Sequence, residues 1–236
     1  MAHCERGDEY LCGQQAHNYK FEGGGAAVLG SIQPQPIDNE PDGTISLKKL
    51  KAAIKPLDSH FAQTKLISIE NTINGKVLPL SYLAELSDFA KQHTLALHLD
   101  GARVYNAAVA LNVNITEIAK YFDSMTVCLS KGLGAPIGSL LFGSQELIAK
   151  ARRWRKVLGG GMRQAGILCA AAKIALTHNV NKLVIDHQNA QYLAEQLATV
   201  TEFSVNKNTV STNMVFAKVN DNINIQELAN ALKEKG

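Results

Sequence analysis

The stretch 81–101, SYLAELSDFAKQHTLALHLDG, joins a predicted amphipathic helix directly to a predicted buried strand. Its first half repeats apolar side chains every three or four residues, as one face of a helix does: Tyr82, Leu86, Phe89 and Ala90. Ser81 is the expected N-cap of this helix. The apolar run 95–100 then ends at Gly101, which is typical of a strand that is buried on both faces.

The same succession of helix, short apolar run and glycine-rich turn recurs along the chain. We expect further strands near residues 66–70, 125–129, 139–142 and 214–216. We expect further helices near residues 47–54, 145–157, 165–177, 180–200 and 225–235. This alternation predicts an α/β fold with a mostly parallel sheet that helices cover on both faces.

The second half of the chain has a different organisation. From about Gln164 onward the pattern is predominantly helical. We therefore predict a large α/β domain over residues 1–179. Residues 180–236 would form a linking helix and part of a small α+β domain.

Composition excludes several classes of protein. The 236 residues are 46% hydrophobic and 19% charged, with 24 basic against 21 acidic side chains, so neither nucleic acid nor a membrane surface is an expected partner. No apolar run approaches the roughly 18 to 20 residues that span a bilayer, and the charged first residues do not resemble a signal peptide.

Cysteine spacing indicates a cytoplasmic protein. The four cysteines are widely separated and form no C-x-x-C pair, which is typical of reduced thiols and predicts no metal site: Cys4, Cys12, Cys128 and Cys169. A secreted protein with one incidental disulfide is the alternative.

Ligands of parallel sheets bind beyond the carboxyl ends of the strands, so the residues that close each predicted strand are candidates for chemistry. These are Glu70, Asp100 and the segment 130–132. Asp100 ends an apolar strand, where a carboxylate stays ionised only beside a hydrogen-bonding or cationic partner. Arg103 or a protonated ring nitrogen of a cofactor would serve. The alternative is a structural aspartate that caps its own turn.

Lys131 is the second candidate, because it stands between a predicted strand and Gly132. We expect partial desolvation there to free its amine as a nucleophile. An ordinary surface lysine is the alternative. The separation of 31 residues from Asp100 to Lys131 fits one helix and one strand, so both would emerge at one sheet edge. A pyridoxal phosphate site requires such a pair: the amine forms a Schiff base, and the carboxylate keeps the ring nitrogen protonated.

Five segments in unbroken order resemble the low-specificity L-threonine aldolases, which belong to the β-eliminating lyase group of fold-type I pyridoxal phosphate enzymes. The resemblance reaches to about Asn213, and it implies that residues 1–179 form the cofactor-binding domain. The segments are QAHNY (15–19), ENT (70–72), HLDGAR (98–103), LSKGLG (129–134) and GGGMRQ (159–164).

The resemblance also implies roles at the cofactor. Lys131 matches the lysine that binds pyridoxal 5'-phosphate covalently, with Ser130 beside it, and Asp100 matches the partner of the ring nitrogen. His17 matches a histidine that stacks on the ring; a helix cap is its alternative. Arg103 matches an arginine that lies near the cofactor and the substrate carboxylate, and a plain ion pair with Asp100 is its alternative.

Further residues also match positions of the family. His60 resembles a second active-site histidine that acts as a base, directly or through water; a surface histidine is the alternative. Asn71 and Asn74 would flank the cofactor pocket. The basic run 152–156 is either a solvated helix face or a phosphate-binding element of a neighbouring subunit's site, because active sites of this family form between subunits.

The implied activity is cleavage of L-threonine or L-allo-threonine to glycine and acetaldehyde by a homodimer or homotetramer. A β-eliminating lyase that acts on aromatic or sulfur amino acids is one alternative, and a non-catalytic remnant of the family is the other.

The sequence also departs from the family. Its chains carry an N-terminal arm, a Gly-Thr loop that binds phosphate and a late arginine that binds the substrate carboxylate, and none of these has a counterpart here. We therefore expect a chain that is truncated at both ends. Groups that position the substrate lower the activation barrier by several kcal/mol. Because such groups are missing, we expect little activity from this chain.

Overall fold

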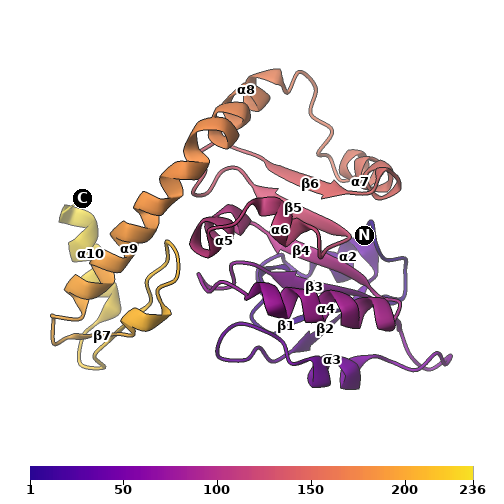
Figure 1. Ribbon diagram of the computed structural model, residues 1–236, viewed down its shortest axis with the longest axis horizontal. Coiled ribbons are helices and arrows are strands. Elements are labelled where there is room, and N and C mark those ends of the chain that lie inside the picture. The colour runs from indigo at the N-terminus through magenta and orange to yellow at the C-terminus, as the bar shows by residue number, and fades with distance from the viewer. Residues whose placement is uncertain (236) are drawn as a thin grey trace.

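A six-stranded sheet forms the centre of the larger part of the molecule (Figure 1). The computed structural model describes residues 1–235. In spatial order the strands are β2 (Gln33–Ile37), β1 (Asp8–Gly13), β3 (Gln63–Glu70), β4 (Ala96–Gly101), β5 (Ser124–Cys128) and β6 (Ser139–Gly143). The first five strands are parallel, and β6 runs antiparallel to β5. The predicted mostly parallel sheet is confirmed.

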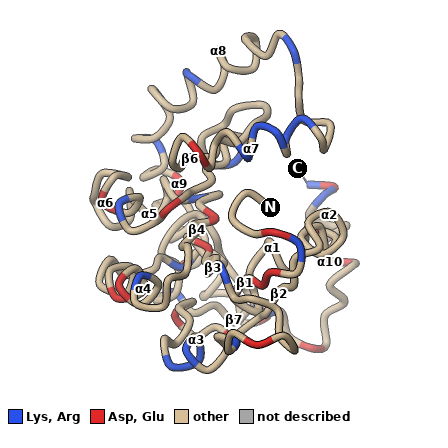
Figure 2. The backbone as a smooth tube through the Cα atoms, turned by 90° about the vertical axis from the view of Figure 1, so that its right-hand side faces the viewer, with Lys and Arg blue, Asp and Glu red and all other residues tan. Residues whose placement is uncertain are grey.

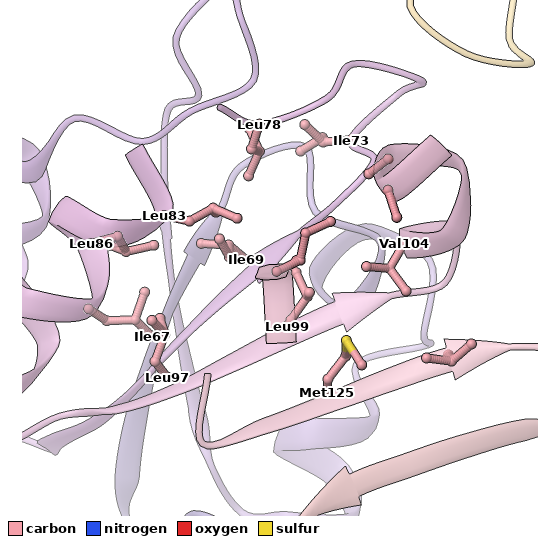
Figure 3. Close-up of a cluster of buried hydrophobic side chains, with 14 of the residues drawn as sticks. Ile67, Ile69, Ile73, Leu78, Leu83, Leu86, Leu97, Leu99, Val104 and Met125 are labelled. Atoms are coloured by element: carbon pink, nitrogen blue, oxygen red, sulfur yellow. The ribbon is translucent and has the colours of Figure 1, made fainter. Parts of the chain in front are cut away.

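Four helices cover one face of this sheet: α3 (Leu47–Ala53), α4 (Leu80–Gln92), α5 (Val104–Leu111) and α6 (Ile115–Ala119). Figure 3 shows Leu83 and Leu86 of α4 beside Ile67 of β3 and Leu97 of β4. All four side chains are buried in the main hydrophobic core. Because burial of each contributes about 1.5–3 kcal/mol, this layer fixes the order and spacing of the central strands.

Side chains on the other face are more polar. Along β4, Leu97 and Leu99 enter the main core, so the alternation of a strand directs His98 and Asp100 to the opposite side. A smaller apolar cluster on that face includes Tyr10. Tyr19 of α1 (His17–Lys20) and Ala26 of α2 (Gly25–Gly30) pack against it. The polar residues of β4 therefore lie on the face that the large core does not occupy.

Two expectations from the sequence need correction, and two strands were not expected. Helix α4 begins at Leu80, with Pro79 rather than Ser81 in the N-cap position and no capping side chain. The predicted strand at 214–216 is unpaired; the strands of the small sheet are β7 (Phe203–Val205) and β8 (Ala217–Val219). Neither β1 nor β2 was predicted from the sequence. The two prolines of β2 weaken its strand pattern, although they are tolerated in an edge strand, which β2 is.

A long helical segment leads from the sheet to the small C-terminal part (Figure 1). It follows α7 (Gln145–Val157) and consists of α8 (Gly166–Ile174), the π-helical turn η1 (Ala175–Asn179), the 3-10 turn η2 (Val180–Lys182) and α9 (Leu183–Leu197). We call residues 166–197 the arm helix. It passes through residue 180 without leaving helical conformations, and the small sheet, the turn η3 (Lys207–Thr209) and α10 (Ile225–Lys235) follow it.

Over residues 1–235, no helix combines the length and apolar character needed to cross a membrane.

Candidate active site

The carboxyl ends of β3, β4 and β5 bring the predicted chemical groups to one edge of the sheet. Glu70 pairs directly with Asp100 in the parallel ladder, and the N–H of Asn71 donates to the Asp100 carbonyl oxygen at 3.0 Å. Asp100 pairs in turn with Thr126 of β5, which runs into the loop that carries Lys131. The structure therefore places the aspartate and the lysine at the same edge, as the spacing between them predicts.

The pKa of Glu70 responds to the charges of its neighbours at this edge. Burial raises the pKa of its carboxyl group, and the negative charge of Asp100 raises it further. The backbone N–H of His17, which donates to Glu70 Oε2 at 2.9 Å, lowers that pKa, as do the charges of His17 and Lys131. Glu70, Asp100, His17 and Lys131 thus form one electrostatic cluster. The sequence identifies Glu70 only as the end of a strand; its pairing with Asp100 shows that it belongs to the site.

Asp100 and Arg103 do not form the ion pair considered from the sequence. Within residues 1–235 no ion pair joins them, and Asp100 Oδ1 instead accepts a hydrogen bond from the N–H of Ala102 at 3.2 Å. Arg103 Nε is buried and has no hydrogen-bond partner. A buried donor without a partner is costly, so this guanidinium is suited to a bound ligand.

His17 is the first residue of α1, beside the cluster. Its Nδ1 lies 2.9 Å from Glu22 Oε1, and its ring is tilted against that of Phe21, with the centroids 5.3 Å apart. Ala16 occupies the N-cap position, so the helix-cap alternative for His17 is wrong. The half-exposed imidazole remains accessible at the sheet edge.

A tight turn presents Lys131. The N–H of Gly134 donates to the Lys131 carbonyl oxygen, and that of Ala135 donates to the Leu129 carbonyl oxygen, both at 2.9 Å. Leu129 is buried, whereas Ser130 and Lys131 are exposed. The expectation that Lys131 is partly desolvated is therefore wrong, because its side chain leaves the buried layer as soon as the strand ends.

The structure does not bring His60 to this edge. His60 precedes β3, whereas Glu70 ends it, and the eight residues of that strand span about 26 Å. The side chain is 84% exposed, and its Nδ1 lies 2.6 Å from Asp58 Oδ1. Within one protomer, His60 therefore lies near the amino ends of the parallel strands, whereas Lys131 lies at their carboxyl ends.

The two asparagines that follow β3 differ. Asn71 is fully buried: its Oδ1 accepts from the N–H of Leu78 at 3.3 Å, and its Nδ2 has no partner. Asn74 adopts a left-handed backbone conformation, with φ of 48°, in the turn that follows.

The basic run lies on α7, away from the cluster. Figure 2 shows lysines and arginines along that helix, and all four basic residues of the run are exposed: Arg152, Arg153, Arg155 and Lys156. A role in a neighbouring subunit's site stays a prediction.

Comparison with known proteins identifies the family. The profile of the beta-eliminating lyase family matches residues 1–220. The low specificity L-threonine aldolase of Escherichia coli (strain K12) is 57% identical over 221 residues, which cover 94% of this chain and 66% of that protein. Low-specificity L-threonine aldolase 1 of Arabidopsis thaliana is 44% identical over 244 residues, which cover all of this chain and 68% of that protein.

Solved structures share the fold. A threonine aldolase of Leishmania major has a TM-score of 0.79 at 20% identity, over 97% of this chain and 67% of that one. A PLP-dependent aminotransferase of Streptococcus suis has a TM-score of 0.69 at 18% identity, over 99% and 61%. This chain spans about two thirds of the length of its curated relatives. It belongs to the beta-eliminating lyase family, among the low-specificity L-threonine aldolases.

Proposed function

We propose that the protein is a pyridoxal phosphate-dependent aldolase that cleaves L-threonine or L-allo-threonine to glycine and acetaldehyde. The observation that supports this most directly is the meeting of Asp100, Glu70, His17 and Lys131 at one sheet edge. Family membership supports the same reaction, because the relatives that match along most of this chain are named for it.

The residues present fit the cofactor. Arg103 Nε is a buried donor without a partner, and Lys131 is an exposed amine at the same edge as Asp100. Bound pyridoxal phosphate supplies an electron-accepting ring, which the protein alone lacks. Lys131 would hold it through Nζ, with Ser130 beside it, Asp100 would keep the proton on the ring nitrogen, and His17 would pack its flat face on the ring.

Substrate groups have partners as well. The planar fork of Arg103 suits the substrate carboxylate, because two N–H donors can bind its two oxygens. His17 is the better candidate for accepting the hydroxyl proton of the substrate, since His60 lies at the other edge of its own protomer. Because its pKa is raised, Glu70 is protonated more readily, and the neutral carboxyl group does not repel the Asp100 carboxylate.

Covalent labelling tests this function. We would add pyridoxal phosphate to the purified chain, follow the visible absorption band, reduce with borohydride and map the modified peptide. A label on Lys131 is the expected result, together with slow release of acetaldehyde from L-threonine that is lost in Lys131→Ala. Labels scattered over surface lysines would refute the proposal, and release of ammonia without acetaldehyde would indicate a different lyase.

We further propose that the protein acts in the cytoplasm as a homo-oligomer. Its four cysteines are free, as in a reducing compartment. Helix α8 is apolar in sequence yet has no buried side chain, with Ile167 84% and Ile174 59% exposed. Such a face favours self-association, so light scattering should give a mass above that of the 25.5 kDa monomer.

A further inference from the structure

The loop that carries Lys131 contacts the arm helix as well as the sheet. Two hydrogen bonds close the loop on itself, from Gly134 to Lys131 and from Ala135 to Leu129. They fix its internal shape but not its position relative to the rest of the molecule. That position depends on what the loop touches outside itself.

The first outside contact comes from the π-helical turn in the arm. Asn179, the last residue of that turn, donates from Nδ2 to the Leu133 carbonyl oxygen at 2.8 Å. Its Oδ1 accepts from Lys182 Nζ at 3.1 Å, so both ends of the amide have partners. Short π-helical turns are rare and are found often at functional sites, because the extra residue redirects the side chains that follow. Here the last side chain of the turn itself, that of Asn179, holds the loop that carries Lys131.

The second contact lies directly beside the lysine. A Cβ atom on Gly132 would lie 2.9 Å from Leu183 Cδ2 and 3.5 Å from Asn106 Oδ1, so this glycine packs closely on both residues. Leu183 is the first residue of α9 and is 1% exposed, and Asn106 of α5 is 2% exposed. The backbone next to Lys131 thus lies on a buried surface that the arm helix helps to form.

A partly buried hydrogen bond joins α5 to the arm helix at that surface. Asn106 Nδ2 lies 3.1 Å from Nε2 of His187 in α9. The amide can donate here only to a neutral imidazole whose Nε2 carries the lone pair. Burial lowers the pKa of His187, against the opposing effect of Asp186, and so favours that neutral form.

We propose that Asn179 and the Asn106–His187 pair are positioning residues for Lys131, so that the arm helix sets where this amine lies at the sheet edge. None of the three touches the reacting groups; each acts through the backbone of the loop. The proposal rests on the proposed function only in naming Lys131 as the lysine that holds the cofactor.

Hydrogen exchange of the cofactor-free chain tests the positioning. The amides of Gly134 and Ala135 report opening of the loop. We expect Asn179→Ala and His187→Ala each to speed their exchange about fivefold, the effect of one lost hydrogen bond of about 1 kcal/mol. Amides between β1 and β3 should not change. Gln188→Ala is the matched control, because Gln188 is the exposed neighbour of His187 on the arm helix.

A conservative variant separates positioning from general stability. His187→Gln keeps an acceptor for Asn106 Nδ2, so it should restore slow exchange in the loop. Unchanged exchange in both alanine variants would overturn the proposal. So would faster exchange throughout the sheet that His187→Gln does not reverse, because it would show a merely structural role.

Labelling with pyridoxal phosphate and borohydride supplies the second readout. In Asn179→Ala, the label on Lys131 should fall severalfold relative to that on exposed Lys91 of α4. An unchanged ratio contradicts the proposal even where exchange is faster. Absence of Lys131 label in the unsubstituted chain refutes the proposed function instead, and the exchange data then decide the positioning of the loop by themselves.

Discussion

Glu70 and Asp100 are direct partners in the parallel pairing of β3 and β4, so two carboxylates end neighbouring strands at the edge that also carries Lys131. Two like charges so close are unfavourable unless one is neutralised. The pKa of Glu70 is raised accordingly, first by burial and also by Asp100. This relationship favours the protonated form of Glu70.

Replacing Glu70 by glutamine should alter how stability depends on pH. Because the folded-state pKa of Glu70 lies above its ordinary value of 4.5, the folded chain binds more protons than the unfolded chain above that pH. The contribution of Glu70 to the free energy of unfolding therefore falls as pH rises above 4.5, and Glu70→Gln should remove this dependence. Urea unfolding at several pH values from 4 to 8 measures it. Parallel curves for the two proteins would contradict the assignment.

Gly101 has a steric role at the same edge. A Cβ atom there would lie against the Thr126 carbonyl oxygen of β5 and 3.1 Å from Val104 Cβ. Since the obstacle includes backbone, the strands would have to separate, and we expect Gly101→Ala to cost about 3 kcal/mol. Gly25→Ala is the control, because no atom lies within 4 Å of its added Cβ. A thermal midpoint that falls equally in both variants would be inconsistent with this account.

The sequence predicts correctly that Asp100 and Lys131 lie at the same ends of the parallel strands, and the reason is physical. Asp100 and Lys131 each follow an apolar run, and strands that are parallel must end at the same side of the sheet. The partner of Asp100 is less predictable. Spacing alone favours Arg103, three residues away, but the turn gives Asp100 the N–H of Ala102 instead.

The location of His60 could not be predicted from the sequence. It matches a family position, yet it precedes β3 while the cluster follows that strand. A motif match carries no information about which end of a strand, or which protomer, a side chain serves. The strand at 214–216 was misplaced for a similar reason, since three-residue strands such as β8 depend on pairing rather than on their own pattern.

The two histidines should respond differently to replacement. His17→Ala removes a ring beside the cluster, and we expect pyridoxal phosphate to bind roughly tenfold more weakly, the effect of about 1.4 kcal/mol. His60→Ala should leave its affinity within about twofold, because His60 lies at the other edge. Absorbance titration of each purified variant gives the dissociation constants. Equal weakening in both would show that His60 reaches a cofactor site, which within this fold requires a neighbouring protomer.

A third histidine should make the fold acid-sensitive. His98 Nδ1 and His3 Nε2 each lie 2.6 Å from Ser124 Oγ. Burial lowers the pKa of His98 to about 4 from 6.5, and the charge of His3 adds to this. Between those values the unfolded chain binds more protons, so the free energy of unfolding should fall as pH drops from 6.5 toward 4 and then level off.

The size of this effect is on the order of 3 kcal/mol. His98→Asn keeps a polar side chain that does not titrate, so its stability curve should be flatter across the same window. Denaturant unfolding at pH 4.5, 5.5, 6.5 and 7.5 measures the slope for both proteins. His93→Asn, a change at the C-cap position of α4, serves as the control. A slope that persists unchanged in His98→Asn would assign the acid sensitivity to other groups, with His3 the first to replace, because its pKa is also lowered by burial.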